Sequence, residues 1–288
     1  MKKRLALITF GGLPQGAESE RLMLPHLAAA GVETEIVDWR LAGSDFSKFD
    51  LIVLRSCWDY HLRPAEFIDW LQRTAGEAPV LNSLETVLWN HNKVYLQEVA
   101  AQEIEIAPTI FVIGNAAVGP QDRSQIKSWS KIVVKPAVSA SAHKTWLMDG
   151  AALPTDADLA RHMNGEPFLI QQFIPEIQTE GEISFIYIDG VFSHAVLKRP
   201  VAGDFRVQQE HGGSAELFLP NAALLSQADE IAASVPQVSQ SLYCRLDAVA
   251  RNGKLVLMEL ELIEPELFLG LAEGAAERFA KAIAWRVK

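Results

Sequence analysis

Short apolar runs alternate with amphipathic segments over the first 85 residues of the chain. The apolar runs have the length of buried strands and lie at residues 5–10, 34–39 and 50–55. Residues 17–30 place leucine and alanine at helical spacing before Gly31, and residues 64–75 begin with a proline that suits the first turn of a helix. The order strand, helix, strand, strand, helix predicts an open α/β layer.

The rest of the chain continues with further strands and helices. Apolar runs predict strands at residues 131–136, 168–174, 183–188 and 191–198. The last two are joined by a turn at Asp189-Gly190 and form a hairpin. Predicted helices lie at residues 89–101, 222–234 and 267–285.

A second hairpin, at residues 245–268, carries the most informative polar pattern. Its apolar runs flank Asn252-Gly253, a strong signal for a tight turn, and are interrupted by Asp247, Glu259 and Glu261. Residues two apart on a strand share a face, so Glu259 and Glu261 form a pair that is unfavourable unless a cation lies between them. Hard oxygen ligands of this kind suit magnesium, which keeps waters and takes further ligands from substrate phosphates.

The length of the turn decides whether Asp247 joins this pair. A two-residue loop would set Asp247 opposite Met258, on the other face from Glu259. A three-residue loop with Gly253 in a left-handed bulge would place all three carboxylates on one face, and we predict this loop. The alternative is a solvated strand face, which the surrounding Leu, Val, Met and Ile residues disfavour.

Composition narrows the classes of partner. The formal charge of 26 − 36 = −10 argues against nonspecific binding to nucleic acid or to an acidic membrane surface, although a local basic pocket can still hold an anion. Cys57 and Cys244 are too few for a disulfide framework, which predicts a reducing, cytoplasmic location. No apolar stretch approaches the roughly 18 residues of a membrane span. Composition leaves the oligomeric state open.

Five cations are candidates for an anion site. Lys93 falls near the start of a predicted helix, where it opposes the helix dipole unless an anion compensates it; the alternative is an ordinary surface lysine. Lys135 ends a predicted strand before residues 137–145, a loop of small residues without the glycines of a phosphate-binding loop. Three cations lie within nine positions and predict an anion clamp: Lys198, Arg199 and Arg206.

The segment after the strand at residues 50–55 is a candidate substrate site. Ligands of open α/β sheets gather beyond the carboxyl ends of the strands. This is where Arg55, Asp59 and Tyr60 fall, and we predict that they contact the substrate. The alternative is that Arg55 and Asp59 form a structural ion pair.

In their order and spacing these pieces resemble the ATP-grasp superfamily over nearly the whole chain. The signs are Lys93, Lys135, the segment QQFI, the acid Glu182, the string KRPVAGDFRVQQEHGG and the Asp…Glu-x-Glu ending. The resemblance implies an α/β and α+β fold, in which an N-terminal open α/β (pre-ATP-grasp) domain precedes a two-lobed ATP-grasp fold. The expected domains are residues 1–88, the first lobe at 89–172 and the second lobe, with the metal-binding hairpin, at 173–288.

The resemblance also implies roles for individual residues toward ATP. Lys93 and Lys135, with Ser139 and Ser141 in the small-residue loop, would approach the phosphates. The adenine hinge, which contacts the base through backbone groups, would be formed by Gln172, Phe173 and Ile174. Glu182, or alternatively Glu180, would accept from the ribose hydroxyls.

The resemblance implies further roles near the phosphoryl group that ATP transfers. Arg206 and Gln208 would contact the phosphates there, with Lys198 and Arg199 in the same basic segment. Asp247, Glu259 and Glu261 would bind magnesium, with manganese as an alternative. The sequence departs from the pattern of the superfamily at residues 139–142, where glycines are usual, and at Glu261, where asparagine is frequent.

Within the superfamily, three strings resemble the O-ureido-serine cyclo-ligases of cycloserine biosynthesis: RSCWDY, SHAVLKRPVAGDFRVQ and MELELIEPELF. This resemblance implies a small amino-acid-like substrate and an ATP-driven ring closure, in which the carboxylate becomes an acyl phosphate and the ureido nitrogen attacks it. The carbamoyl group is lost afterwards.

Three other functions stay open from the residues alone. One is a two-substrate, peptide-type ligase like glutathione synthetase or the glutamate-adding enzymes, and another is a non-catalytic ATP-binding module. The third is a metal-dependent hydrolase, which no histidine spacing supports. His194 and His211 flank the basic segment and are either acid–base groups or structural side chains.

Overall fold

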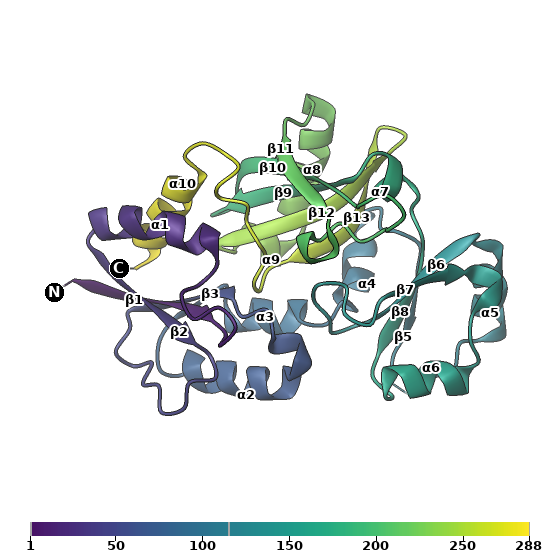
Figure 1. The fold of residues 1–288 in the computed structure, drawn as a ribbon, viewed down its shortest axis with the longest axis horizontal. Coiled ribbons are helices and arrows are strands. Elements are labelled where there is room, and N and C mark those ends of the chain that lie inside the picture. Colours follow the sequence, from purple (N-terminus) through teal and green to yellow (C-terminus); the bar gives the residue numbers. More distant parts are fainter. Residues whose placement is uncertain (1, 115, 288) are drawn as a thin grey trace.

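The computed structural model describes residues 2–114 and 116–287, which form three sheets lying side by side along the long axis of the molecule (Figure 1). The first sheet is parallel, in the order β2-β1-β3-β4. Its strands are β1 (Lys3–Thr9), β2 (Val32–Asp38), β3 (Leu51–Ser56) and β4 (Val80–Leu81). The predicted open α/β layer is confirmed.

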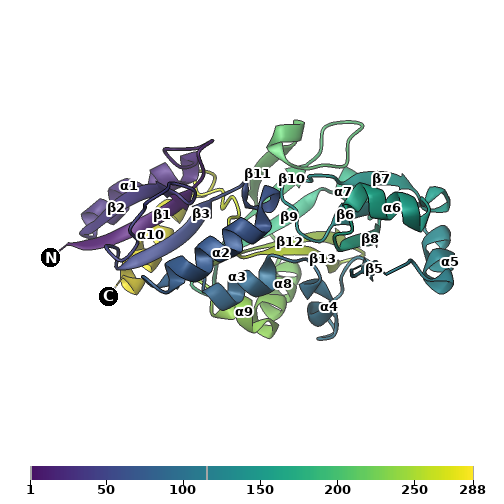
Figure 2. The same ribbon diagram turned by 90° about the horizontal axis from the view of Figure 1, so that it is seen from below.

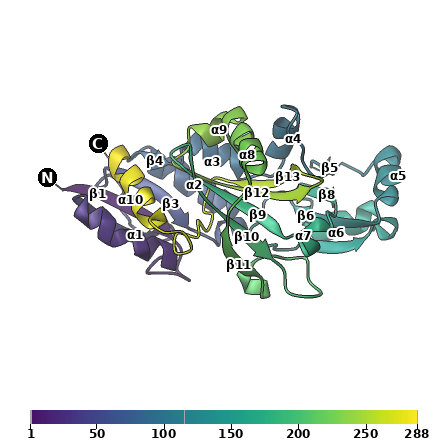
Figure 3. The same cartoon turned by 90° about the horizontal axis from the view of Figure 1, so that it is seen from above.

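Helices cover both faces of this sheet, because β3 is apolar on both sides and buried along its whole length. On one face α2 (Pro64–Ala75) packs Phe67 and Leu71 against Ile52 and Leu54 (Figure 2). The other face is covered by α1 (Glu18–Ala29) and by α10 (Ala275–Arg286), the last helix of the chain (Figure 3). The C-terminal helix therefore returns to the N-terminal sheet.

The central sheet has the order β11-β10-β9-β12-β13 and is antiparallel throughout. It consists of β9 (Glu182–Ile188), β10 (Val191–Arg199), β11 (Ser214–Phe218), β12 (Tyr243–Arg251) and β13 (Lys254–Glu261). Helices α8 (Ala222–Ser234) and α9 (Pro236–Ser239) cover one face through Leu224, Ala228 and Val238 (Figure 3). This leaves the opposite face of β12 and β13 for other contacts.

The third sheet has the order β5-β8-β6-β7. Its strands are β5 (Thr109–Val112), β6 (Lys131–Pro136), β7 (Trp146–Asp149) and β8 (Phe168–Gln172), and it packs against α5 (Pro120–Ser128) and α6 (Asp156–Met163). The short helix α7 (Glu176–Thr179) connects it to the central sheet. The division of the chain at residues 88/89 and 172/173 stays a prediction.

Two predicted helices differ from the structure. The helix predicted at residues 89–101 is two helices, α3 (Leu84–Asn90) and α4 (Tyr95–Ala100), and Lys93 lies in the turn between them. The helix predicted at residues 267–285 begins only at Ala275, because Gly274 adopts a left-handed conformation with φ of 70°.

Side chains from residues 82–95 complete the outer edge of β13, which would otherwise expose unpaired backbone groups. The Tyr95 hydroxyl donates to Leu260 O at 2.9 Å and accepts from Leu260 N at 2.7 Å. The Asn90 amide donates to the same carbonyl and accepts from Leu262 N. Further along, the buried Asn82 side chain accepts from Leu242 N and donates to Tyr243 O and Leu262 O. The segment that follows β4 is therefore attached to the outer edge of β13 by hydrogen bonds.

No helix in the described ranges is long and apolar enough to cross a membrane.

The first prediction concerns this edge. Tyr95→Phe removes both hydrogen bonds of the hydroxyl and leaves the buried N–H of Leu260 in β13 without an acceptor. We therefore expect the free energy of unfolding to fall by about 2–4 kcal/mol. Urea denaturation followed by circular dichroism measures it. Tyr187→Phe is the matched control, because that hydroxyl donates to a single exposed carboxylate, that of Asp229, and the loss of stability should stay below about 1.5 kcal/mol. Equal losses in both variants would contradict the interpretation.

Candidate active site

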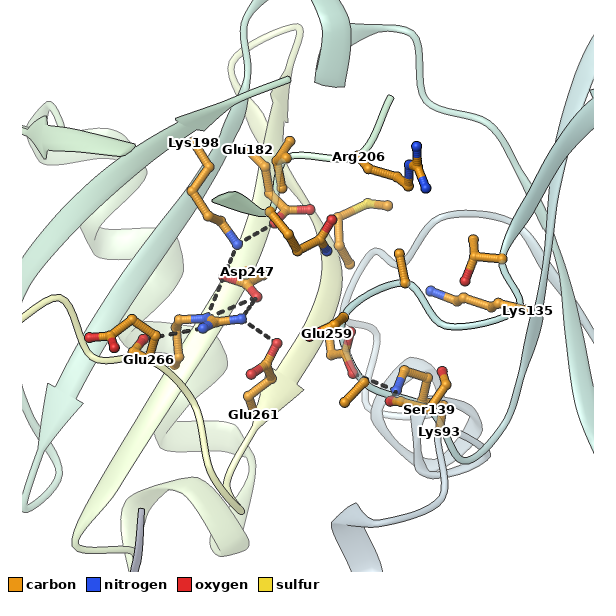
Figure 4. A pocket seen from close by; sticks show the side chains of 18 of the residues that line it. Lys93, Lys135, Ser139, Glu182, Lys198, Arg206, Asp247, Glu259, Glu261 and Glu266 are labelled. Atoms are coloured by element: carbon orange, nitrogen blue, oxygen red, sulfur yellow. Dashed lines mark hydrogen bonds and ion pairs between the residues drawn. The ribbon is translucent and has the colours of Figure 1, made fainter. Parts of the chain in front are cut away.

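A cavity of about 410 Å³ lies between the central sheet, the third sheet and the loops that leave the first sheet. Its walls come from β6 and β8 on one side and from β9, β10, β12 and β13 on the other (Figure 4). The small-residue loop at residues 139–145 and the segment at 205–210 complete it. All three parts of the chain therefore contribute side chains to one site.

The register of β12 and β13 places the three predicted carboxylates on one face, though not for the predicted reason. The loop has two residues, Asn252 and Gly253, both with positive φ, and not three. A bulge at Met258 shifts the register instead, so that Ala248 pairs with Leu257 while Asp247 pairs with Glu259. The predicted three-residue loop is wrong, and the predicted single face of carboxylates is confirmed.

Basic side chains lie between these carboxylates (Figure 4). The Arg245 guanidinium, opposite Glu261 in the register, contacts Glu261 and lies 3.0 Å from Asp247 Oδ2. Lys198 Nζ lies 3.1 Å from Asp247 Oδ1 and 2.5 Å from Glu182 Oε1. Sequence reasoning missed Arg245, although its position two residues before Asp247 puts it on the same strand face and would have identified it.

Lys93 contributes a further cation from the turn between α3 and α4. Its ammonium lies 2.9 Å from Glu259 Oε1 and donates to Ser139 O at 2.6 Å. It therefore ties β13 to the small-residue loop. Lys135, by contrast, faces the cavity without a hydrogen bond or ion pair to any described residue, and burial lowers its pKa.

Burial and neighbouring charges set opposite pKa shifts in this cluster. Burial alone would raise the pKa of Asp247, but the charges of Arg245 and Lys198 outweigh it and hold that pKa below its usual range. Burial raises the pKa of Glu261 to about 7, because the charge of Arg245 offsets it only in part and the charges of Asp247 and Glu259 add to it. Burial, and then the charge of Glu261, raises the pKa of Glu264 to about 8.

Most of the residues that the sequence singled out line this cavity. They are Tyr60, Lys93, Lys135, Ser139, Ser141, Phe173, Glu182, Lys198, Arg206, Gln208, Asp247, Glu259 and Glu261. Six others lie outside its lining: Arg55, Asp59, Gln172, Ile174, Glu180 and Arg199.

Strand alternation explains two of these exclusions. Lys198 points into the cavity, so its neighbour Arg199 points away, where it pairs with Glu216 on β11. The three cations of the predicted clamp therefore do not converge. Lys198 and Arg206 line the cavity, but Lys198 is paired with two of its acids, and Arg199 lies outside the lining. Arg206 is half-buried and pairs with Asp204 at 2.7 Å.

The predicted adenine hinge needs correction in the same way. Gln171 and Phe173 line the cavity, whereas Gln172 between them does not. The N–H groups of Gln172 and Phe173 already donate to Pro108 O and Lys131 O, so these two donors are engaged within the protein. Ile174 is buried in a small apolar cluster. The structure also separates the two ribose candidates, because Glu182 lines the cavity and Glu180 is exposed outside it.

Arg55 and Asp59 do not contact each other and do not reach the cavity. Arg55 is 1% exposed, lies over the Tyr243 and Phe279 rings and donates to Pro265 O at 2.9 Å. Asp59 accepts from the Trp39 indole at 2.8 Å. The alternative ion pair between them is therefore wrong, and the predicted substrate contact of Arg55 and Asp59 stays a prediction that this cavity does not support. Tyr60 remains at the cavity wall.

The two histidines differ in environment. His194 is buried with its Nε2 2.9 Å from Leu267 O, and burial lowers its pKa to about 4, so it is a structural side chain away from the cavity lining. His211 lies 3.4 Å from Ser141 O, and the His143 ring lies 5.3 Å from the His61 ring. The small-residue loop is therefore in contact with the first sheet's loops and with the central sheet's basic segment.

The carboxylates fit a metal ion only in part. In residues 2–114 and 116–287 no group of three or more His, Cys, Asp or Glu side chains is arranged to hold a metal. Asp247 is engaged by Ser184, Lys198 and Arg245, so the predicted three-ligand site is not assembled. Glu259 and Glu261 supply the hard oxygen donors that magnesium prefers, and their side chains are about a quarter exposed toward the cavity.

Comparison with known proteins defines the class of this chain. A model of a RimK-like ATP-grasp domain matches residues 125–265, and a model of the N-terminal domain of D-cycloserine synthetase DcsG matches residues 5–82. The chain belongs to the ATP-grasp superfamily and is an ADP-forming ligase that makes carbon–nitrogen bonds.

Individual relatives share almost its whole length. The chain is 28% identical over 282 residues to the cycloserine biosynthesis protein DcsG of Streptomyces lavendulae, covering 92% of this chain and 93% of that one. It superposes on the crystal structure of D-cycloserine synthetase DcsG with a TM-score of 0.86, at 24% identity, over 99% and 100% of the two chains. The ATP-grasp ligase PsnB, in a complex with its minimal precursor, Mg and ADP, superposes with a TM-score of 0.62 at 13% identity, over 99% and 98%. The fold thus implies the use of ATP and Mg²⁺.

The second prediction concerns the pH dependence of stability. The pKa of Glu264 is about 8 in the folded chain and about 4.3 in the unfolded chain. The folded state keeps this proton to a higher pH than the unfolded state does. The contribution of Glu264 to the free energy of unfolding is therefore fully present below about pH 4 and is lost as the pH rises through 8. Glu264→Gln should therefore be more stable than the unmodified protein at pH 8.5, by a few kcal/mol, and nearly equal to it at pH 4.5.

Urea denaturation without nucleotide or metal at the two pH values checks this. Glu180→Gln, at an exposed acid outside the cavity, is the control and should leave the pH profile unchanged. A Glu264→Gln profile parallel to that of the unmodified protein would contradict the burial argument.

Proposed function

We propose that this ligase closes a ring within one small, amino-acid-like substrate, as in an O-ureido-serine cyclo-ligase. The observation that carries the proposal is similarity along the full chain to a cycloserine biosynthesis protein, which includes the substrate-side N-terminal domain. A likeness confined to the ATP-binding lobes would support ATP use without indicating a substrate.

The arrangement of charges supports an ATP site in this cavity. Lys93 and Lys135 line the cavity and are the candidates for binding the phosphates, together with Ser139 and Ser141 of the small-residue loop. Glu182 is the candidate acceptor for the ribose hydroxyls, and Phe173 offers an apolar surface for the base. These roles rest on the resemblance and on the shared cavity.

The proposed reaction has two bond exchanges. A substrate carboxylate oxygen bonds to the γ-phosphorus of ATP while the bond from that phosphorus to the bridging oxygen of ADP breaks. The substrate nitrogen then bonds to the carbonyl carbon while the carbon–oxygen bond to phosphate breaks, and the proton on nitrogen passes to solvent. With O-ureido-serine the attacking nitrogen is the one bonded to oxygen, so a five-membered ring forms, and water later removes the carbamoyl group.

Side chains of this cavity neutralise the charge that moves in the first step. Phosphoryl transfer depends on positioning and charge neutralisation more than on covalent groups of the protein. Arg206 and Lys135 supply fixed positive charge near the transferred group. Glu259 and Glu261 would hold the magnesium ion, which when bound neutralises phosphate oxygens, with manganese as the alternative ion.

Both cysteines are buried free thiols, which supports the proposal of a reducing, cytoplasmic location.

The third prediction separates one-substrate from two-substrate chemistry. We expect ADP release from magnesium-ATP with O-ureido-serine alone, tested as both enantiomers, and a cyclic product visible by mass spectrometry. Alanine, serine, cysteine and glutamate, singly and in pairs, form the comparison set. Release that requires a pair of amino acids would overturn the cyclising function in favour of a peptide-type ligase.

The fourth prediction uses two arginines of the same segment. Arg206→Ala should lower the turnover number by roughly a hundredfold, because a charge-stabilising group at the phosphoryl site is lost. Arg199→Ala is the matched control: its side chain points away from the cavity, so turnover should change by less than about twofold. Steady-state ADP release gives both values, and comparable losses in the two variants would remove Arg206 from the site.

A further inference from the structure

Glu264 is a buried acid of the cavity for which the protein supplies no partner. Its residue is 9% exposed and lines the cavity, and no described residue donates a hydrogen bond to its carboxyl group. The backbone around it is held in place, because the Trp58 indole donates to Glu264 O at 2.9 Å and Arg55 donates to Pro265 O at 2.9 Å. Buried polar groups normally have a hydrogen-bond partner, so a buried carboxyl group without one, on a backbone held in place, is expected where a ligand supplies the donor.

The other buried or half-buried acids in the cavity wall are all compensated. Glu182 and Asp247 pair with Lys198, Glu259 with Lys93, and Glu261 with Arg245. Glu266, two residues beyond Glu264, accepts from the Ser19 hydroxyl at 2.8 Å and from Phe268 N at 2.7 Å. Glu210 also lies in the wall and is exposed to solvent. Among the described residues, Glu264 is therefore the one buried cavity acid left without a donor.

Its electrostatic surroundings restrict the chemistry of the missing partner. Glu261 and Glu259 act on Glu264 as negative charges, and Lys93 and Arg245 act on it as positive ones. Each of these two cations is already paired with one of those acids, so neither is left for Glu264, and an anionic ligand group beside its carboxylate would be repelled. A neutral ligand group would leave the carboxyl in its protonated form, which burial favours, whereas a cationic hydrogen-bond donor stabilises the carboxylate. An ammonium group meets both requirements.

We propose that Glu264 binds the α-ammonium group of the substrate and so selects amino acids over the corresponding simple carboxylic acids. The assignment rests on the proposed function, which requires an amino-acid-like substrate. The α-carbon carries both the ammonium and the carboxylate, so this contact keeps the substrate carboxylate in the same cavity as the candidate magnesium ligands Glu259 and Glu261. Lys135 and Arg206 serve the phosphate side of the same cavity.

The experiment compares two ligands that differ only in the ammonium group. O-ureido-serine and 3-(ureidooxy)propanoate, which has hydrogen in its place, are titrated calorimetrically into the protein saturated with magnesium and a non-hydrolysable ATP analogue. The unmodified protein should bind the amino acid about 10- to 100-fold more tightly, the range of a hydrogen bond to a charged group. Glu264→Gln should bind both within about threefold.

Two controls distinguish direct contact from a structural effect. Glu266→Gln removes the charge of a neighbouring acid whose oxygens are already bonded, so the preference for the amino acid should persist. Glu264→Asp keeps a carboxylate and should keep part of the preference, and it replaces Glu264→Gln if that variant does not bind the nucleotide. Equal binding of the two ligands by the unmodified protein, or a preference that survives in Glu264→Gln, would overturn the assignment.

Catalytic readouts separate this assignment from other roles of the same residue. A general base or a metal ligand at Glu264 would lower turnover or shift the magnesium requirement in Glu264→Gln while the preference for the amino acid remained, and that result would also overturn it. The proposed function fails separately, if O-ureido-serine binds through its ammonium group but releases no ADP.

Discussion

The guanidinium of Arg245 is the contact on which the site depends. Four acids converge on one sheet face, and burial penalises the charge of three of them, Glu182, Asp247 and Glu261. Arg245 lies between Asp247 and Glu261, and Lys198 joins Asp247 to Glu182 on the neighbouring strands. Removing one member of such a network leaves buried charge uncompensated, which costs more than the pair itself contributes. The alternation of sign is what allows so many carboxylates to face one cavity.

The cavity has one regular side, formed by a strand, and one irregular side, formed by a loop. Its floor is the end of β13, whose outer edge is closed by hydrogen bonds from Asn90 and Tyr95. Its opposite side includes the small-residue loop, in which Ser141, Ala142 and Lys144 adopt positive φ without being glycine. That loop is attached by Lys93 to Ser139 O and by contacts of two histidines. The end of β13, which carries the candidate metal ligands, is held by hydrogen bonds, whereas the loop has few attachments. This combination suits a site that must admit a nucleotide.

Among the described residues that line the cavity, Lys135 and Glu264 have ionisable groups without an ion-pair partner, one basic and one acidic. Lys135 is half-buried and Glu264 is buried, and burial shifts both pKa values toward the neutral form. The protein could have neutralised either group with a neighbour, as it does for Lys198 and Glu182. Leaving them open lowers stability and reserves each charge for a ligand of opposite sign, a phosphate for Lys135 and an ammonium for Glu264.

The sequence by itself determined the layers, the carboxylates of the hairpin and the superfamily, because strand length, turn residues and motif order are local properties of the chain. It also determined that a cation must separate paired acids on a strand. Which cation does so was decided by the tertiary structure, since Arg245 and Lys93 reach those acids from a strand position and from a turn. The bulge at Met258 and the burial of Arg55 likewise depend on how neighbouring elements pack. These features are set by register and by contacts between distant segments, which no local pattern encodes.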